Sequence, residues 1–268
     1  MAVLIIASKR DSAGQNIARE LTNSKGFQSV PSASGDLLQS GNAFLKHVDT
    51  DGIHTSSLAL DVQVDAVIFA SRHRSERNEP ALTVHWTGNT TSRADFGGNP
   101  KSLSFTDPPR LRAALLGLDE AREARRLNYA VTLEATHHGP TELGVPTLFV
   151  EIGSTEKEWN DVEAARAASD AIWKAATNPL LGKNAVGFGG GHYCDKQSMA
   201  IRNDGYAFGH IFSKYFFEEY DEKMVHMAFA RTRGECRTAV IDWKGIRGPE
   251  RAKLLDTLKQ MEIEVIRV

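Results

Sequence analysis

Asp65-Ala66-Val67-Ile68-Phe69-Ala70 is a continuous apolar run bounded by turn signals. Pro146-Thr147-Leu148-Phe149-Val150 is a second run of the same kind. A strand that is buried on one face alternates apolar and polar residues, whereas these two runs do not alternate. They predict strands that are buried on both faces, as in a sheet covered by helices on both sides.

The remaining periodicity extends this pattern along the chain. Further apolar runs predict strands at 2–7, 82–87, 129–136, 184–188, 237–242 and 262–268, beside those at 64–70 and 146–152. Helical periodicity predicts helices at 109–126, 156–177 and 249–260, and Asp11 or Ser12 could cap a first helix through Leu21. Strands interleaved with helices indicate an α/β fold with a mixed, mainly parallel sheet and helices on both faces. Ligands of such sheets bind beyond the carboxyl ends of the strands.

Bulk properties limit the class of protein. The chain has 268 residues, 41% of them hydrophobic, and neither a linker nor a repeat divides it, so we expect a single domain over 1–268. Cys194 and Cys236 form no CxxC pair, which fits a reducing cytoplasm. The opening run at 1–7 is too short to span a membrane, and the net charge of −2 gives no general attraction to nucleic acid. We therefore expect no membrane and no DNA partner.

Basic residues gather in two places. One group is expected to form ion pairs on a solvated helix face and comprises Arg110, Arg112, Arg122, Arg125 and Arg126. The other group, Arg72, Arg74 and Arg77, follows a buried strand directly. Because loops after buried strands often carry function, we expect the second group to bind a ligand.

Two histidines stand at the end of the predicted strand 129–136. Side chains alternate across a strand, so Glu134, Thr136 and, if the strand persists, His138 are expected to share a face, while His137 points away or leaves with the turn. Gly139-Pro140 ends the strand sharply. Imidazole suits proton transfer near neutral pH or metal ligation, although either histidine could equally be structural.

Three other features lie within predicted strands or directly after them. Glu151 interrupts an apolar strand, and a buried carboxylate needs an ion pair, a proton or a metal. Gly189-Gly190-Gly191 precedes His192 and predicts a backbone N–H nest for an oxyanion, or a tight turn. Single histidines at strand ends are His73, His85 and His210. No HExxH motif is present, so a metal site would draw its ligands from separate loops.

At these residues the sequence closely resembles the archaeal and plant type of D-aminoacyl-tRNA deacylase. The matching blocks occur in family order at 8–17, 71–75, 82–89, 134–141, 146–159, 187–193 and 209–215. The resemblance implies hydrolysis of the ester that joins a D-amino acid to the 3′ end of tRNA, a step of translation quality control. It also implies a fold similar to peptidyl-tRNA hydrolases and purine nucleoside phosphorylases, bound zinc, and a monomer.

The resemblance suggests roles for the residues. Water would be activated by Glu151 or His138, with Glu134 and Thr136 beside them. Zinc would be held by His137, His138 and His192, with His85 or His210 as less favoured ligands. The ester carbonyl would be polarised by zinc or by backbone N–H groups of Gly189, Gly190 and Gly191. Arg72, His73 and Arg74 would contact the acceptor end of tRNA.

Three other functions use some of the same residues. A metal-dependent hydrolase of small esters or amides would use the histidines and Glu151 but would not need the basic loop. A tRNA-binding module without catalysis would need the loop alone. A nucleoside phosphorylase is the alternative at the level of the fold, and a shared fold does not carry function.

Overall fold

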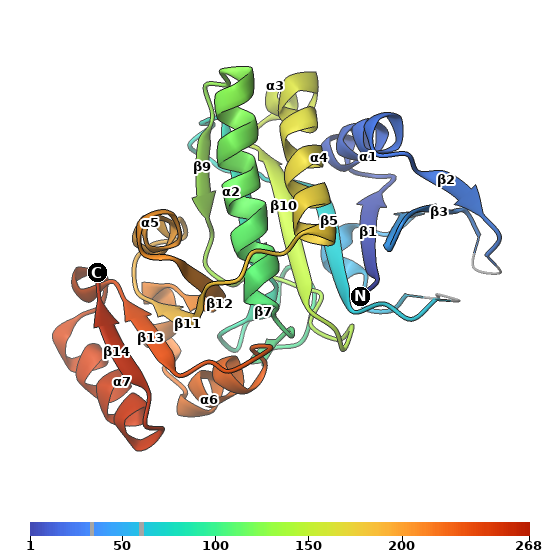
Figure 1. Cartoon of the computed structure of the whole chain (residues 1–268). Helices are drawn as coiled ribbons and strands as arrows, with labels where there is room; N and C mark the ends of the chain where they lie inside the picture. Colours follow the sequence, from blue (N-terminus) through green and yellow to red (C-terminus); the bar gives the residue numbers. More distant parts are fainter. Residues whose placement is uncertain (33–34, 59–61) are drawn as a thin grey trace.

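The computed structural model describes residues 1–32, 35–58 and 62–268. The large sheet has the strand order β2-β3-β4-β1-β5-β10-β6-β9, and the small sheet has the order β12-β11-β13-β14 (Figure 1). The strands of the large sheet are β1 (Val3–Ser8), β2 (Gln28–Val30), β3 (Leu37–Ser40), β4 (Ala43–Val48), β5 (Ala66–Arg72), β6 (Ala81–Trp86), β9 (Ala130–Leu133) and β10 (Thr147–Gly153). The others are β7 (Gly88–Asn89), β8 (Ser102–Leu103), β11 (Lys183–Phe188), β12 (Tyr206–Phe212), β13 (Thr238–Ile241) and β14 (Glu264–Arg267).

The helices connect and cover these strands. The α-helices are α1 (Ser12–Ser24), α2 (Pro108–Arg125), α3 (Glu156–Trp159), α4 (Val162–Thr177), α5 (Asp195–Asp204), α6 (Glu222–Ala230) and α7 (Gly248–Gln260). Short 3₁₀ turns are η1 (Gly52–His54), η2 (Lys214–Glu219) and η3 (Trp243–Gly245). In the large sheet β1, β4, β5 and β10 run parallel, whereas β6 is antiparallel to β10. The small sheet is entirely parallel. The predicted α/β fold with a mixed, mainly parallel sheet is confirmed.

The two faces of the large sheet are covered differently. Val3, Ile5 and Ile68 belong to the core beneath α1, α2 and α4, and Figure 1 shows α2 and α4 in front of the strands. Phe69 and Phe149 point to the opposite face, where η1 and neighbouring loops cover them. Both faces are therefore dry, which explains why the strand sequences are continuously apolar. Glu151 follows Phe149 by two residues and shares its face, so the loop-covered face carries the chemistry.

Several boundaries differ from those predicted. The strand predicted at 129–136 ends at Leu133, and the helix predicted at 156–177 is divided into α3 and α4. Asp161 makes this division, because its carboxylate accepts the backbone N–H groups of Glu163 and Ala164 and so starts a new helix. Strands β2, β3, β4, β7, β8 and β12 and helices α5 and α6 were not expected. Among the described residues, no helix is both long and apolar enough to cross a membrane.

The arginines of α2 are more structural than expected. Arg110 is 1% exposed, pairs with Asp107 at 2.9 Å and donates to the carbonyl groups of Ala175 and Ala176. It thereby ties the start of α2 to the end of α4 and satisfies carbonyls that the helix end leaves free. Arg125 joins the same helices by pairing with Asp170 at 2.6 Å.

Candidate active site

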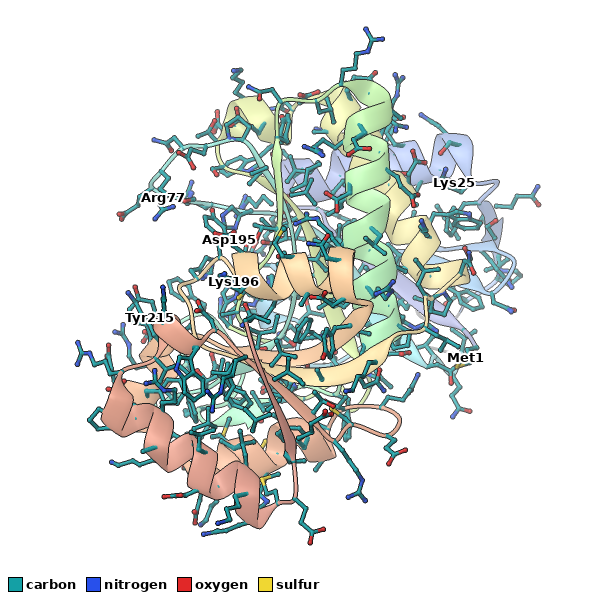
Figure 2. All side chains as sticks on the ribbon, turned by 60° about the vertical axis from the view of Figure 1, so that its left-hand side comes forward. Met1, Lys25, Arg77, Asp195, Lys196 and Tyr215 are labelled. Atoms are coloured by element: carbon teal, nitrogen blue, oxygen red, sulfur yellow. The ribbon has the colours of Figure 1, made fainter. Side chains whose placement is uncertain are left out.

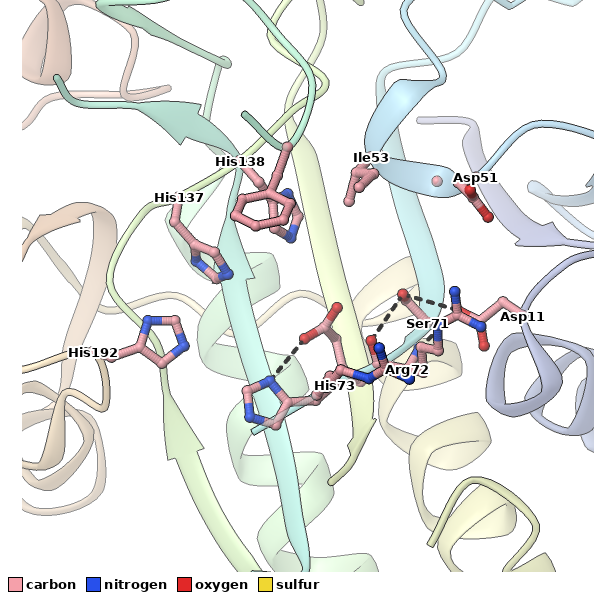
Figure 3. Close-up of a pocket in the computed structure, with 13 residues that line it drawn as sticks. Asp11, Asp51, Ile53, Ser71, Arg72, His73, His137, His138 and His192 are labelled. Atoms are coloured by element: carbon pink, nitrogen blue, oxygen red, sulfur yellow. Dashed lines mark hydrogen bonds and ion pairs between the residues drawn. The ribbon is translucent and has the colours of Figure 1, made fainter. Parts of the chain in front are cut away.

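A cavity of about 340 Å³ opens on the loop-covered face of the large sheet. Its lining includes Asp11 after β1, His73 after β5, Glu151 on β10, His137 and His138 after β9, and His192 after β11. Figure 3 shows four histidines around one space, and they come from three separate segments of the chain: His73, His137 with His138, and His192. The loops after β1, β5, β9 and β11 therefore bring these residues together with Glu151 of β10 around one cavity.

The turn after β9 directs its side chains differently from a strand. Glu134 forms one isolated bridge with Tyr193, and His138 has a left-handed backbone with φ of 45°. Strand alternation therefore stops at Leu133. His137 and His138 both reach the cavity, whereas Thr136 points away from it. The prediction that Glu134, Thr136 and His138 share a face is wrong for this reason.

Glu151 is the carboxylate that borders the cavity. It is 3% exposed, and its Oε2 lies 3.5 Å from His73 Nδ1 and 3.7 Å from His85 Nε2. Thr83 donates its hydroxyl to the same oxygen at 3.4 Å. Burial alone would raise the pKa of Glu151, but the hydrogen bonds and charges of His73 and His85 outweigh it and hold the pKa well below its usual range. Glu151 is therefore ionised at neutral pH.

Glu134 is a second buried carboxylate, 1% exposed. Its oxygens lie 2.9 Å from His192 Nε2, 3.0 Å from His73 Nδ1 and 3.6 Å from His137 Nε2. Burial opposes ionisation here too, but His192 and then His73 lower the pKa of Glu134 to about 2. Although these ring nitrogens are near, no N–H or O–H of a described residue has the angle needed for a hydrogen bond to either oxygen. A buried anion with such poor partners has capacity left for a proton or a cation.

His73 lies between the two carboxylates. It is 4% exposed, and its Nε2 meets the hydroxyl of Tyr193 at 2.8 Å. Burial lowers its pKa, but Glu151 and Glu134 outweigh burial and raise it. His73 was expected to bind substrate. Both of its ring nitrogens contact protein groups, Nδ1 the two carboxylates and Nε2 the hydroxyl of Tyr193.

Three histidines present ring nitrogens to one another. Ligand atoms of His85, His137 and His138 all lie within 4.8 Å of one another. Each ring Nδ1 contacts a backbone carbonyl: His85 that of Trp86 at 3.2 Å, His137 that of Ala135 at 2.8 Å, and His138 that of Gly139 at 2.7 Å. Because a carbonyl only accepts, each Nδ1 carries the hydrogen, and Nε2 is the atom left for a cation or a proton.

The protonation preferences of these histidines differ. Burial and the nearby His85 lower the pKa of His138 to about 4, and the same causes place the pKa of His137 well below its usual value. Both are neutral at pH 7, the form that binds metals. For His85, burial is outweighed by Glu151, which raises the pKa. A bound cation would replace that proton.

Two predicted residues lie on the far side of the turn. Thr136 shares its hydroxyl with His210 Nδ1 at 3.1 Å and accepts the backbone N–H of Ile211 at 3.1 Å. His210 Nε2 donates to the carbonyl of Ser104 at 2.9 Å, and His210 is 0% exposed. Both ring nitrogens of His210 are thus occupied by neutral groups. Thr136, expected to be catalytic, and His210, expected to bind metal, therefore lie outside the cavity that Glu151 borders.

The glycine loop faces a different cavity. Gly190 and Gly191 line a second cavity with Lys214, Lys244 and Arg247, while His192 alone reaches back to Glu134. Gly189 has φ of 93°, and a Cβ there would lie 2.8 Å from the carbonyl oxygen of Asp242. Gly189 is therefore needed for a tight turn and close backbone packing, whereas a Cβ at Gly191 would meet no atom within 4 Å. The expected oxyanion nest at Gly189, Gly190 and Gly191 lies away from the carboxylates and is not supported.

The basic loop after β5 forms the outer wall of the cavity. Arg72 and Arg74 line it, and both guanidinium groups lie 5.6 Å from the ring of Trp159. Arg72 also donates to the carbonyl of Arg10 at 3.2 Å. Farther along the loop, Arg77 projects from the surface in Figure 2.

Sequence reasoning missed three residues near this cavity. Asp11 was considered only as a helix cap, and it does accept the N–H of Gly14 at 2.9 Å, yet it also lines the cavity. Tyr193 holds His73 and is adjacent in sequence to His192, a proximity that could have drawn attention to it. Phe96 lines the cavity from a loop of turn-forming residues, where the pattern gave no signal.

Comparison with known proteins places similar sequences in one family. The family model of D-aminoacyl-tRNA deacylase matches residues 60–266. A D-aminoacyl-tRNA deacylase of Methanosarcina acetivorans is 35% identical, with 99% of this chain and 92% of the relative covered. One of Thermococcus onnurineus is 34% identical, with 98% and 99% covered. The crystal structure of a conserved protein of unknown function superposes with a TM-score of 0.92 at 31% identity, covering 99% of this chain and 95% of that one.

Proposed function

The chain belongs to the D-aminoacyl-tRNA deacylase family, and we propose that it hydrolyses the ester of D-aminoacyl-tRNA in the cavity that Glu151, His137 and His138 line. In this reaction a water oxygen attacks the ester carbonyl carbon, and the bond from that carbon to the ribose oxygen breaks. The ribose oxygen takes up a proton, and the D-amino acid leaves with a free carboxylate. One observation supports this location above the others: Glu151 and four imidazoles line a single opening, and the buried Glu134 and His85 contact these groups from behind.

Glu151 is the general base in this proposal. It borders the cavity directly, whereas Glu134 contacts the cavity through His73 and His192. The low pKa of Glu151 keeps it ionised, so it accepts a proton from water at any pH near neutral. A carboxylate of low pKa is a weak base, but an aminoacyl ester is already reactive and the barrier to lower is modest. Glu134 then acts as a positioning residue for His73 and His192.

The histidines fit a zinc ion. His85, His137 and His138 supply imidazole donors, the ligand type zinc favours, and each is oriented through Nδ1 by a backbone carbonyl. His192, the ligand expected from sequence, lies with His73 and Glu134 instead. A zinc ion bound here would supply a Lewis acid for the ester carbonyl. Under this proposal His138 is a ligand, which leaves Glu151 as the base.

Metal content tests the ligand set without any use of turnover. We expect about one zinc per chain by atomic spectroscopy, a loss of most of it in His137→Ala and His138→Ala, and full retention in His210→Ala. Equal zinc content in all three variants would remove the three histidines from the proposal. If zinc is also catalytic, chelation abolishes deacylation and added zinc restores it.

The arginines of the outer wall are proposed to attract the tRNA backbone. Arg72 and Arg74 border the cavity, and the polyanionic substrate must bring its acceptor end to that opening. Such contacts orient a nucleic acid without reading its sequence. Action as a monomer in the cytoplasm belongs to the same proposal and rests on the family resemblance.

Deacylation of matched substrates tests the function itself. The purified protein should hydrolyse D-tyrosyl-tRNA much faster than L-tyrosyl-tRNA under the same conditions, measured by loss of the labelled amino acid from tRNA. Equal rates for the two, or no hydrolysis of either, would refute the assignment. Including a chelator in a parallel series separates the activity from its metal requirement.

A further inference from the structure

Phe96 is a large apolar side chain at the mouth of the catalytic cavity, yet it is 65% exposed. Single exposed apolar residues are common on proteins, so exposure alone indicates nothing. Its position is the informative feature, because the ring stands where substrate must enter.

The backbone that carries Phe96 is held firmly. The Phe96 carbonyl accepts the N–H of Gly139 at 3.1 Å, directly beside His138. Asn89 donates its side-chain amide to the carbonyl of Gly97 at 2.8 Å, and Gly97 packs so closely on the Ile53 carbonyl that no Cβ would fit. Phe96 therefore presents its ring from a fixed backbone, which reduces the entropy lost on binding.

Phe96 also stands between two cavities. One is the catalytic cavity, and the other, of about 180 Å³, is lined by Asn89, Thr91 and Arg93 among others. Both cavities are lined by the same three residues: Phe96, His137 and His138. A ligand that occupies both cavities must pass these three side chains.

We propose that the smaller cavity binds the 3′-terminal adenosine of the substrate and that Phe96 stacks on its adenine. The inference rests on the proposed function, because an aminoacyl-tRNA end consists of an acyl group and an adenosine joined by the reacting ester. An ester placed at His137 and His138 puts one part in each cavity. The acyl part takes the larger cavity, since Glu151 lines that one. Every base has a flat π-face, and stacking on an aromatic side chain is a main source of affinity for single-stranded ends.

Substrates that differ on each side of the ester test this assignment. We would measure kcat/KM of Phe96→Ala with D-tyrosyl and D-alanyl esters of adenosine, and with the ethyl esters of the same amino acids. The penalty should follow the leaving group, with about a tenfold loss for both adenosine esters and less than a twofold change for both ethyl esters. A penalty that follows the acyl group would mean that Phe96 binds the amino acid side chain, and would overturn the proposal. An equal loss on all four esters would overturn it as well.

Inhibition of D-tyrosyl-tRNA hydrolysis by adenosine 5′-monophosphate gives a second measurement, which does not depend on turnover of small esters. Phe96→Ala should raise the inhibition constant about tenfold, Phe96→Trp should restore it, and Phe105→Ala should leave it unchanged. Phe105 is the matched control, 41% exposed on a cavity that contains none of the site residues. An unchanged constant in Phe96→Ala refutes the adenosine site while hydrolysis of D-tyrosyl-tRNA still stands. Failure of the wild-type protein on that tRNA would instead refute the proposed function.

Discussion

Thr136 and His138 are two residues apart, yet they point to opposite sides of the turn. The polar atoms around His210, which Thr136 contacts, are satisfied by the protein, whereas those around His138 are not. On one side Thr136 and Ser104 occupy both ring nitrogens of a fully buried His210. On the other side His138 opens on a cavity, and behind the histidines that line this cavity the buried carboxylate of Glu134 lacks well-aligned donors. The first environment is closed and satisfied, and the second is open and incomplete.

This difference shows what separates a structural histidine from a functional one. Burial alone does not distinguish them, because His85 on the open side is as fully buried as His210, although His137 and His138 are partly exposed. The distinguishing property is whether the protein itself satisfies each polar atom, because leaving a buried polar group without a partner costs about 1–3 kcal/mol. A fold retains that cost where a substrate or cation supplies the missing partner.

On the open side, removing the charge of Glu151 should give the largest loss of activity. Glu151→Gln keeps the shape but cannot accept a proton from water, so we expect kcat for D-aminoacyl-tRNA to fall by about 10²–10⁴. Single-turnover deacylation measures this loss. Glu156→Gln is the control, since Glu156 is exposed and five residues away on the same segment. A fall of less than about fivefold in Glu151→Gln would show that another group activates water.

On the closed side, the buried His210 should make the free energy of unfolding depend on pH. Burial, which outweighs the hydrogen bond to Ser104, lowers the pKa of His210 to about 3. The unfolded chain protonates this residue near its ordinary pKa of about 6.5, so below that pH the unfolded state binds a proton that the folded state refuses. Stability due to neutral His210 is therefore complete above about pH 6.5 and is lost as pH falls toward 3.

Comparison of wild type with His210→Gln isolates this contribution from the other titrating groups. The difference in free energy of unfolding between the two should shrink by about 2 kcal/mol from pH 7 to pH 5, from about 1.4 kcal/mol per pH unit for one proton. Urea unfolding at each pH measures it. A difference that stays constant over this range would mean that His210 titrates normally and that its side of the turn is not closed.

The strands that sequence predicted well are those with the simplest surroundings. β1, β5 and β10 are dry on both faces, and continuous apolar runs mark them clearly. β2 and β3 are short, partly exposed edge strands, so their patterns are weak. β12 is fully buried, but Gly209 and His210 interrupt its apolar run and hid it.

The site was predictable in residue type but not in direction. Glu151, His137, His138 and His192 were recognised because polar groups at the ends of buried strands are unusual. The facing of Thr136 was wrong, since period-2 alternation was extended past Leu133, where the ladder ends. The clustering of His85 with His137 depends on the pairing of β6 with β9 and on the bridge between Thr87 and His137, long-range contacts that one sequence does not reveal.

The smallest expected effect concerns the rim of the open side. Arg72→Ala with Arg74→Ala removes two cations that line the cavity, so binding of tRNA should weaken several-fold and the slope of log affinity against log salt should flatten by about 0.7 for each lost phosphate contact. Arg72→Lys with Arg74→Lys keeps the charge but changes the stacking on Trp159, and should preserve the slope. Filter binding of tRNA across a salt series separates the two variants. If the slope is unchanged in both double variants, these arginines do not contact tRNA phosphates. Their role is then packing on Trp159 alone, and the substrate site on the open side is limited to the residues inside the cavity.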